Sequence, residues 1–148
     1  MQDFEPIQVG QITIRYIVDG SSDAKPGQFE LGVPPGARVP PAHSHDNNDE
    51  YIYVLEGVLR YRVGDEVRDL HPGQSMVSPR GKVHAFSNHG ATHAKALVTQ
   101  YPDLGPQYFR DISELLSISG PPNPALIAQV MGKYGLVPEL PGAPAASQ

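Results

Sequence analysis

Three histidines and one glutamate are the residues of this sequence whose types and spacing best suit chemistry. His43 and His45 are separated by one residue, Glu50 follows a short polar stretch, and His84 lies further along the chain. In a β-strand, residues i and i+2 point to the same face, so two imidazoles from one strand can reach one point. Three imidazoles and a carboxylate form a mixed donor set for a divalent transition metal. Such a set leaves one or two positions exchangeable, as an open catalytic site requires.

The segment between the first two histidines and the glutamate is polar and turn-forming. Residues 46–49 can let the chain double back, so that Glu50 faces the same interior as the two imidazoles. A lone His-x-His in a strand is common and seldom binds metal, so the interpretation depends on the whole pattern. His71, His89 and His93 lie in turns or at strand edges and are expected to be solvated surface residues.

Length and composition exclude several classes of protein. A chain of 148 residues favours a single domain with a normal core. It has no cysteine, so any metal must be held by histidine and carboxylate ligands. The net charge is −5 and lysine and arginine form no basic run, which argues against a nucleic-acid partner. No signal peptide and no apolar run of membrane-spanning length is evident, so we expect a cytoplasmic protein without a membrane partner.

Short runs of β-branched and aromatic residues, separated by glycine and proline turns, extend over most of the chain. Short strands at this spacing indicate an all-β sandwich or barrel. The sequence predicts strands at residues 11–18, 28–33, 51–55, 58–63, 66–70, 75–78, 83–88 and 94–101.

The pattern changes after Pro102, where apolar residues recur at helical spacing. Asn123 followed by Pro124 predicts an N-cap and a first helical residue, and Gly135 predicts the end of that helix. We therefore expect a barrel at residues 1–105, a helical extension at 106–137 and a flexible tail at 138–148. The extension is expected to pack on the barrel or on a partner subunit, as a cap, a lid or a dimer contact.

Two motifs in the chain resemble those of the cupin superfamily. The first runs from Gly36 through His43-Ser44-His45 and Glu50 to Gly57, and departs from the family pattern only in its leading glycine, which stands one residue early. The second runs from Gly73 through Pro79-Arg80-Gly81 and His84 to Asn88 without departure. The resemblance implies an antiparallel double-stranded β-helix, the cupin jelly-roll barrel, with short C-terminal α-helices.

The resemblance also assigns roles to individual residues. It implies that His43, His45, Glu50 and His84 are the ligands of one divalent transition metal, which could be iron, nickel, manganese, cobalt or zinc. It gives structural roles to the turn positions Gly57, Gly73, Pro79, Gly81 and Asn88. The short segment between the motifs is similar to that of small single-domain bacterial cupins described as quercetin-dioxygenase-like. Dimers are common among small cupins, so a homodimer is expected.

Strand alternation predicts which side chains surround the site. Ile52 and Val54 share the face of Glu50 and are expected to line the pocket, and Phe86 shares the face of His84. Tyr51 and Tyr53 should face away, into the core or a dimer contact. The sequence does not decide whether the polar strand residues Gln28, Glu30 and Gln100 face the pocket, and Arg80 is expected to be solvated.

The site is compatible with functions from two classes. The first is an enzyme acting on a small enolic or phenolic molecule, either a dioxygenase with Glu50 as a catalytic base or another metal-dependent enzyme (isomerase, cyclase, decarboxylase or lyase). The second is a non-catalytic module that binds a small molecule. The fold and the predicted metal ligands are compatible with all of these functions and do not distinguish them.

Overall fold

A computed structural model describes residues 4–139 of the chain. These residues form eleven strands, two α-helices and one short 3₁₀-helix. In chain order they are β1 (Ile7–Val9), β2 (Ile12–Val18), the 3₁₀-helix (Ser21–Asp23), β3 (Gly27–Val33), β4 (His43–His45), β5 (Asp49–Glu56), β6 (Leu59–Val63), β7 (Glu66–Leu70), β8 (Ser75–Ser78), β9 (His84–Ser87), β10 (Ala94–Tyr101), α1 (Pro106–Leu116), α2 (Pro124–Lys133) and β11 (Leu136–Pro138).

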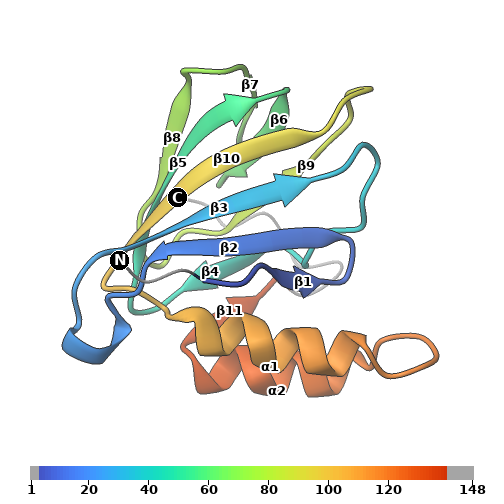
Figure 1. The fold of residues 1–148 in the computed structure, drawn as a ribbon. Coiled ribbons are helices and arrows are strands. Elements are labelled where there is room, and N and C mark those ends of the chain that lie inside the picture. The colour runs from blue at the N-terminus through green and yellow to red at the C-terminus, as the bar shows by residue number, and fades with distance from the viewer. Residues whose placement is uncertain (1–3, 140–148) are drawn as a thin grey trace.

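The strands form two antiparallel sheets with the core between them (Figure 1). One sheet has the order β1-β2-β3-β10-β5-β8 and the other the order β11-β4-β9-β6-β7. Strands that are neighbours in space are mostly distant in sequence, so the chain passes repeatedly from one sheet to the other. This arrangement confirms the predicted double-stranded β-helix.

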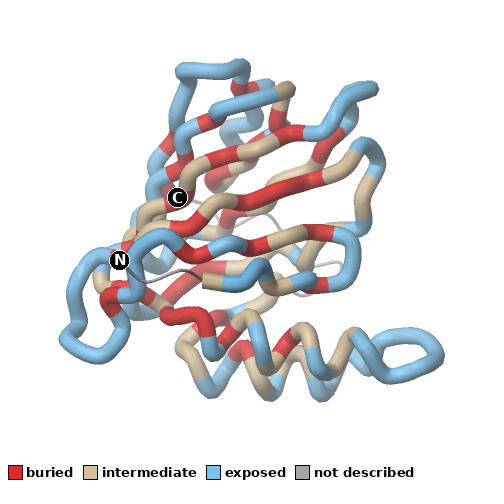
Figure 2. The backbone as a smooth tube through the Cα atoms, viewed as in Figure 1, coloured by how far each residue is buried: buried red, intermediate tan, exposed pale blue. Residues whose placement is uncertain are grey.

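Alternating burial along the strands places one face of each sheet in the core. In β10 every second residue from Ala94 to Gln100 is buried, and the residues between them are partly exposed. Figure 2 shows this alternation as bands of buried and exposed backbone along the strands. Most of the inward side chains are aliphatic or aromatic, so their burial supplies the main favourable term in folding.

The two helices lie side by side at one end of the barrel (Figure 1). Helix α1 packs against β1 and α2 packs against β11, which are the edge strands of the two different sheets. The Asn123 side chain accepts hydrogen bonds from the backbone N–H groups of Ala125 and Leu126, which confirms the predicted N-cap. In the described part of the chain, neither helix is long and apolar enough to cross a membrane.

Two short strands were not expected from the sequence. β1 forms a tight hairpin with β2, in which Val9 pairs with Ile12. β11 pairs with β4, so that Leu136 lies opposite His45, although residues 106–137 were predicted to be helical. Each has only three residues and follows no clear alternation, so its pairing depends on the neighbouring strand. The predicted flexible tail lies outside the described residues except for positions 138 and 139.

Gly57, at the end of the first motif, and Asn88, at the end of the second, have the structural roles that were expected of them. Gly57 follows β5 with a φ of +69°, and a Cβ atom there would lie 2.4 Å from the carbonyl oxygen of His93. Only glycine fits that position. Buried Asn88 donates hydrogen bonds to the carbonyl oxygens of Val33 and Thr92, and thereby ties together two loops at one end of the barrel.

Candidate metal centre

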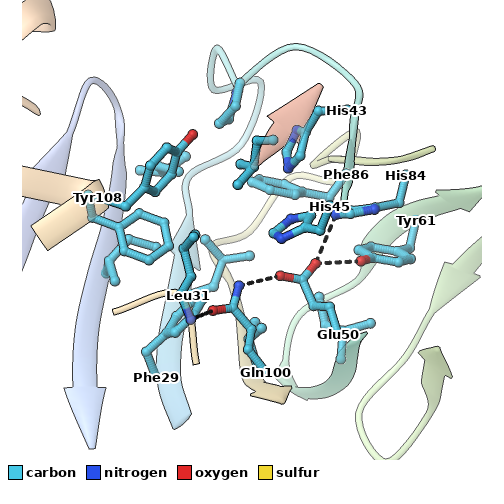
Figure 3. Close-up of a pocket in the computed structure, with 18 residues that line it drawn as sticks. Phe29, Leu31, His43, His45, Glu50, Tyr61, His84, Phe86, Gln100 and Tyr108 are labelled. Atoms are coloured by element: carbon cyan, nitrogen blue, oxygen red, sulfur yellow. Dashed lines mark hydrogen bonds and ion pairs between the residues drawn. The ribbon is translucent and has the colours of Figure 1, made fainter. Parts of the chain in front are cut away.

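The three histidines come together on neighbouring strands of one sheet. β4 supplies His43 and His45, β9 supplies His84, and His43 pairs directly with His84 across the two strands. One ligand nitrogen of each histidine lies within 4.8 Å of the others. β5, in the opposite sheet, brings Glu50 to the same cavity (Figure 3). Residues 46–48 carry the chain between the two sheets, as the turn-forming composition of this segment predicted.

Hydrogen bonds to acceptor oxygens orient all three imidazoles. His43 Nδ1 lies 2.8 Å from the carbonyl oxygen of Pro41, and His84 Nδ1 lies 3.3 Å from that of Lys82. His45 Nδ1 lies 3.3 Å from Oδ1 of Asn48. Because these oxygens only accept, Nδ1 is the protonated nitrogen of each neutral ring and Nε2 carries the free lone pair. Metal-binding histidines are commonly oriented in this way.

Two of the free nitrogens make no hydrogen bond to the protein. Nε2 of His45 and Nε2 of His84 are buried, and neither makes a hydrogen bond within residues 4–139. A buried polar atom without a partner costs about 1–3 kcal/mol. A divalent ion held by these nitrogens would remove that cost, so the observed residues fit a metal site. This fit supports the predicted binding of a metal.

Glu50 lies beside the histidine group rather than within it. Its Oε2 atom is 3.1 Å from His84 Nε2, an ion-pair contact without hydrogen-bond geometry. Gln100 Nε2 donates to Oε1 over 2.8 Å, and the Tyr61 hydroxyl donates to Oε2 over 3.1 Å. The Tyr61 hydroxyl is also 2.8 Å from Ser78 Oγ. The carboxylate is therefore fixed on the cavity wall, and its predicted role as a fourth ligand stays a prediction.

The pKa values of the site residues differ according to their surroundings. Burial, together with the neighbouring imidazoles of His84 and His45, lowers the pKa of His43 to about 4. Burial also lowers the pKa of His45. Burial acts in the same direction on His84, but the Glu50 carboxylate outweighs it, so the pKa of His84 is raised and that of Glu50 is lowered. Two imidazoles are thus kept neutral, which is the form that binds metal.

We expect the metal-free protein to lose stability as the pH falls from 6.5 to 5. In this range the unfolded chain protonates His43 and His45 more fully than the folded chain does, because both folded pKa values are lowered. The pair of His84 and Glu50 contributes equally throughout this range, since the raised pKa acts above 6.5 and the lowered one below about 4.5. The expected loss is on the order of 2 kcal/mol, measured by urea unfolding in chelator.

A matched pair of variants tests the origin of this pH dependence. His43→Gln removes one of the responsible imidazoles and should reduce the slope of stability against pH. His89→Gln makes the same change at an exposed histidine and should leave the slope unchanged. A stability that does not vary over this range would contradict the assignment.

The cavity in front of the histidines has a volume of about 60 Å³. Ile52 and Phe86 line it, as the strand alternation predicted. Val54 does not, although it shares the face of Glu50. Val54 lies two residues after Ile52 in β5 and is fully buried in the core. It therefore packs behind the cavity wall without forming part of it.

The structure decides the positions of the polar strand residues that the sequence left open. Gln100 faces the cavity, whereas Gln28 bonds to Thr99 and Glu30 pairs with Arg15, both outside it. Arg80 is solvated as expected and pairs with Asp49.

Tyr51 and Tyr53 point away from the site, as predicted, but they do not enter the core. They are 43% and 46% exposed. The predicted homodimer contact stays a prediction.

Four aromatic residues of the cavity, Phe29, Tyr61, Tyr108 and Phe109, were not identified from the sequence. Tyr61 alternates with Arg60 and Arg62 in β6, and this pattern could have shown that it points inward. Tyr108 and Phe109 come from α1, and both line the cavity. Their helical spacing was evident, but it could not show that the helix lies beside the histidines.

Comparisons with known proteins agree with this geometry. Residues 29–100 match the cupin domain model. The chain is 36% identical over 89 residues to the tetracenomycin polyketide synthase protein TcmJ of Streptomyces glaucescens, covering 60% of this chain and 56% of that protein. It is 31% identical over 78 residues to protein SchB of Streptomyces halstedii, covering 49% and 56%. The chain thus spans little more than half the length of these curated relatives.

Solved structures show the same fold. One is a sugar phosphate isomerase of the cupin superfamily from Silicibacter pomeroyi, with a TM-score of 0.57, 24% identity, and coverage of 64% of this chain and 62% of that one. The barrel, the matched residues and the histidine cluster occur together in one segment of the chain. Residues 29–100 thus match a cupin domain, and the likeness to the solved structure shows that the chain shares its fold.

Proposed function

We propose that this protein is a metal-dependent enzyme that acts on a small enolic or phenolic molecule. His43, His45 and His84 would hold one divalent transition ion, with Glu50 as a further ligand. The observation that carries the proposal is the pair of buried Nε2 atoms, of His45 and His84, that make no hydrogen bond within residues 4–139. A histidine cluster that served only to pack the core would leave these atoms as an uncompensated cost.

The residues around the ion would bind and orient the ligand. When bound, the ion supplies Lewis-acid polarisation and, if it is redox-active, a means of using dioxygen. Glu50 is placed to accept a proton from an enol or phenol, because its carboxylate is ionised and lies on the cavity wall. Gln100 and Tyr61 hold that carboxylate in position, and the apolar wall formed by Ile52 and Phe86 excludes water.

A dioxygenase of the quercetinase type is the first candidate reaction. It would place both atoms of dioxygen in the cleaved product. The short segment between the two motifs and the helical C-terminal extension are similar to those of quercetin-dioxygenase-like cupins, which supports it. The similarity to a polyketide synthase protein favours, as a second candidate, a reaction without dioxygen, such as a cyclisation or isomerisation. Polyketide chains carry enolisable carbonyl groups, so both candidates share the same substrate chemistry.

Oxygen consumption by the iron-loaded protein separates the two candidates. The panel would contain a flavonol, a catechol and a β-diketone, with the zinc-loaded protein as the control that cannot use dioxygen. A dioxygenase should consume one dioxygen per molecule of substrate with iron and none with zinc. Product formation with zinc, without oxygen uptake, would favour the second candidate. No binding of any member to the metal-loaded protein would contradict the proposal as a whole.

A further inference from the structure

The cavity at the histidines is smaller than the usual site for an organic ligand. Its volume is about 60 Å³. Sites for drug-sized organic molecules usually measure about 300–1,000 Å³. Only the metal-binding end of an enolic or phenolic molecule can occupy this cavity. The rest of the molecule must therefore extend out of it.

A larger apolar groove lies at the same end of the barrel. Its volume is about 370 Å³, and it runs between the β1–β2 hairpin, residues 38–41 and the two helices. Most of the side chains along it are aliphatic or aromatic. They include Val9, Ile112, Leu116, Ile127 and Met131. The groove therefore has the size and polarity that the apolar part of an organic ligand requires.

The groove and the cavity share a wall. Ile12, Pro40, Tyr108 and Phe109 line both spaces. Helix α1 supplies two of these four residues, which places the helix at the boundary between the spaces. The two spaces are therefore adjacent, with these side chains between them, so a ligand at the histidines has to pass the side chains to enter the groove.

Tyr108 offers a polar contact at this boundary. The residue is only 6% exposed, and no hydrogen bond to its hydroxyl is found within residues 4–139. By contrast, the hydroxyls of Tyr16, Tyr61 and Tyr134 each bond to a carboxylate. Figure 3 shows Tyr108 on the side of the cavity opposite the histidines. The hydroxyl is not fully buried, unlike Nε2 of His45 and His84, so it is accessible to a ligand and can donate a hydrogen bond to one of its oxygens.

We infer that the ligand is an elongated molecule with an oxygen-rich head at the histidines and an apolar, aromatic body in the groove beneath the helices. Tyr108 donates a hydrogen bond to it at the boundary. This inference rests on the proposed function and adds to it the substrate class and a specificity-determining residue. It also gives the C-terminal helices a role, since they form one side of the binding site.

Two chelating probes test the inference on zinc-loaded protein freed of unbound zinc. Maltol carries a hydroxypyranone head alone, and 3-hydroxyflavone carries the same head with an aromatic body. Burial of the added rings should make 3-hydroxyflavone bind at least about tenfold more tightly than maltol. Dissociation constants would be measured by calorimetry for maltol and by fluorescence for 3-hydroxyflavone.

Three variants locate the body of the ligand. Ile127→Trp fills the groove from α2 and should remove most of the advantage of 3-hydroxyflavone while leaving maltol binding unchanged. Val67→Trp, the matched control, adds the same bulk at an exposed position of β7 and should change neither affinity. Tyr108→Phe keeps the ring and should weaken 3-hydroxyflavone about fivefold through the lost hydrogen bond.

The outcomes separate this inference from the proposed function. If maltol fails to bind the zinc-loaded wild type, the proposed function fails. If maltol binds but 3-hydroxyflavone gains nothing, or Ile127→Trp leaves its affinity unchanged, the groove is not the site of the ligand body. If Tyr108→Phe leaves the affinity for 3-hydroxyflavone unchanged, the Tyr108 hydroxyl does not bind the ligand.

Discussion

Replacing His43 and His45 by alanine is expected to reduce the bound divalent ion from one per chain to none. The two residues supply two of the three nitrogens that converge on one point, and His84 with Glu50 cannot hold an ion alone with comparable affinity. Metal analysis of the purified variant, together with zinc titration, measures the effect. The wild type should also gain about 2.7 kcal/mol of stability at a zinc concentration of 100 times the Kd.

Controls make this result specific to the site. His89→Ala removes an exposed histidine and should keep one ion per chain. Unfolding of the double variant in chelator shows whether it still folds, so that loss of metal is not confused with loss of structure. An ion retained at full occupancy by a folded double variant would contradict the ligand assignment.

Glu50→Gln is expected to lower turnover by a factor of about 10²–10⁴, the usual contribution of a positioned acid or base. The amide keeps the size of the side chain but cannot accept a proton. It also offers one acceptor oxygen in place of two, where Gln100 and Tyr61 both donate to the carboxylate. The measurements are steady-state turnover with the substrate found in the panel, and metal content in parallel.

The comparison of rate and metal content separates the two roles of Glu50. Glu30→Gln makes the same chemical change in a surface ion pair with Arg15 and should leave both quantities unchanged. If Glu50→Gln loses the ion, Glu50 acts chiefly as a ligand. If it keeps both the ion and full turnover, proton transfer by Glu50 is excluded.

The electrostatics of the site explain why these two replacements should differ. His43 and His45 are held neutral by burial, so they are available to bind a cation without first losing a proton. The Glu50 carboxylate raises the pKa of His84 in the metal-free protein, and an ion bound at His84 would take the place of the proton that this contact favours. Metal binding should therefore release protons.

Much of the fold could be read from local pattern. The alternation of apolar and polar residues in β5, β6 and β10 placed these strands within a residue or two of their observed bounds, because period-2 burial is a property of each strand by itself. The Asn123 N-cap was equally readable, since a cap depends on adjacent residues. β1 and β11 were not predicted because a strand of three residues is too short to show an alternation of apolar and polar residues. Their pairing partners are supplied by the tertiary structure.

The same division holds for the pocket. Ile52 and Phe86 follow from strand alternation, whereas Val54 has the right face but lies too far along β5 to reach the cavity. Odd or even position along a strand decides which face of the sheet a side chain lies on. How close that side chain lies to the cavity depends on how the two sheets pack. Gln100 and Tyr108 required the structure for a related reason. The first is one of several polar strand residues, and the second belongs to a helix whose docking position is a long-range contact.

The sequence by itself pointed to His43, His45, Glu50 and His84, because their spacing and the glycine and proline positions around them resemble the two cupin motifs. Only the tertiary structure decided what surrounds them. It showed that Nε2 of His45 and His84 is buried without a partner, that Glu50 is held by Gln100 and Tyr61, and that α1 and α2 form one side of a groove. Ligand types are local, but burial, pKa and cavity shape arise from side chains that meet only after folding.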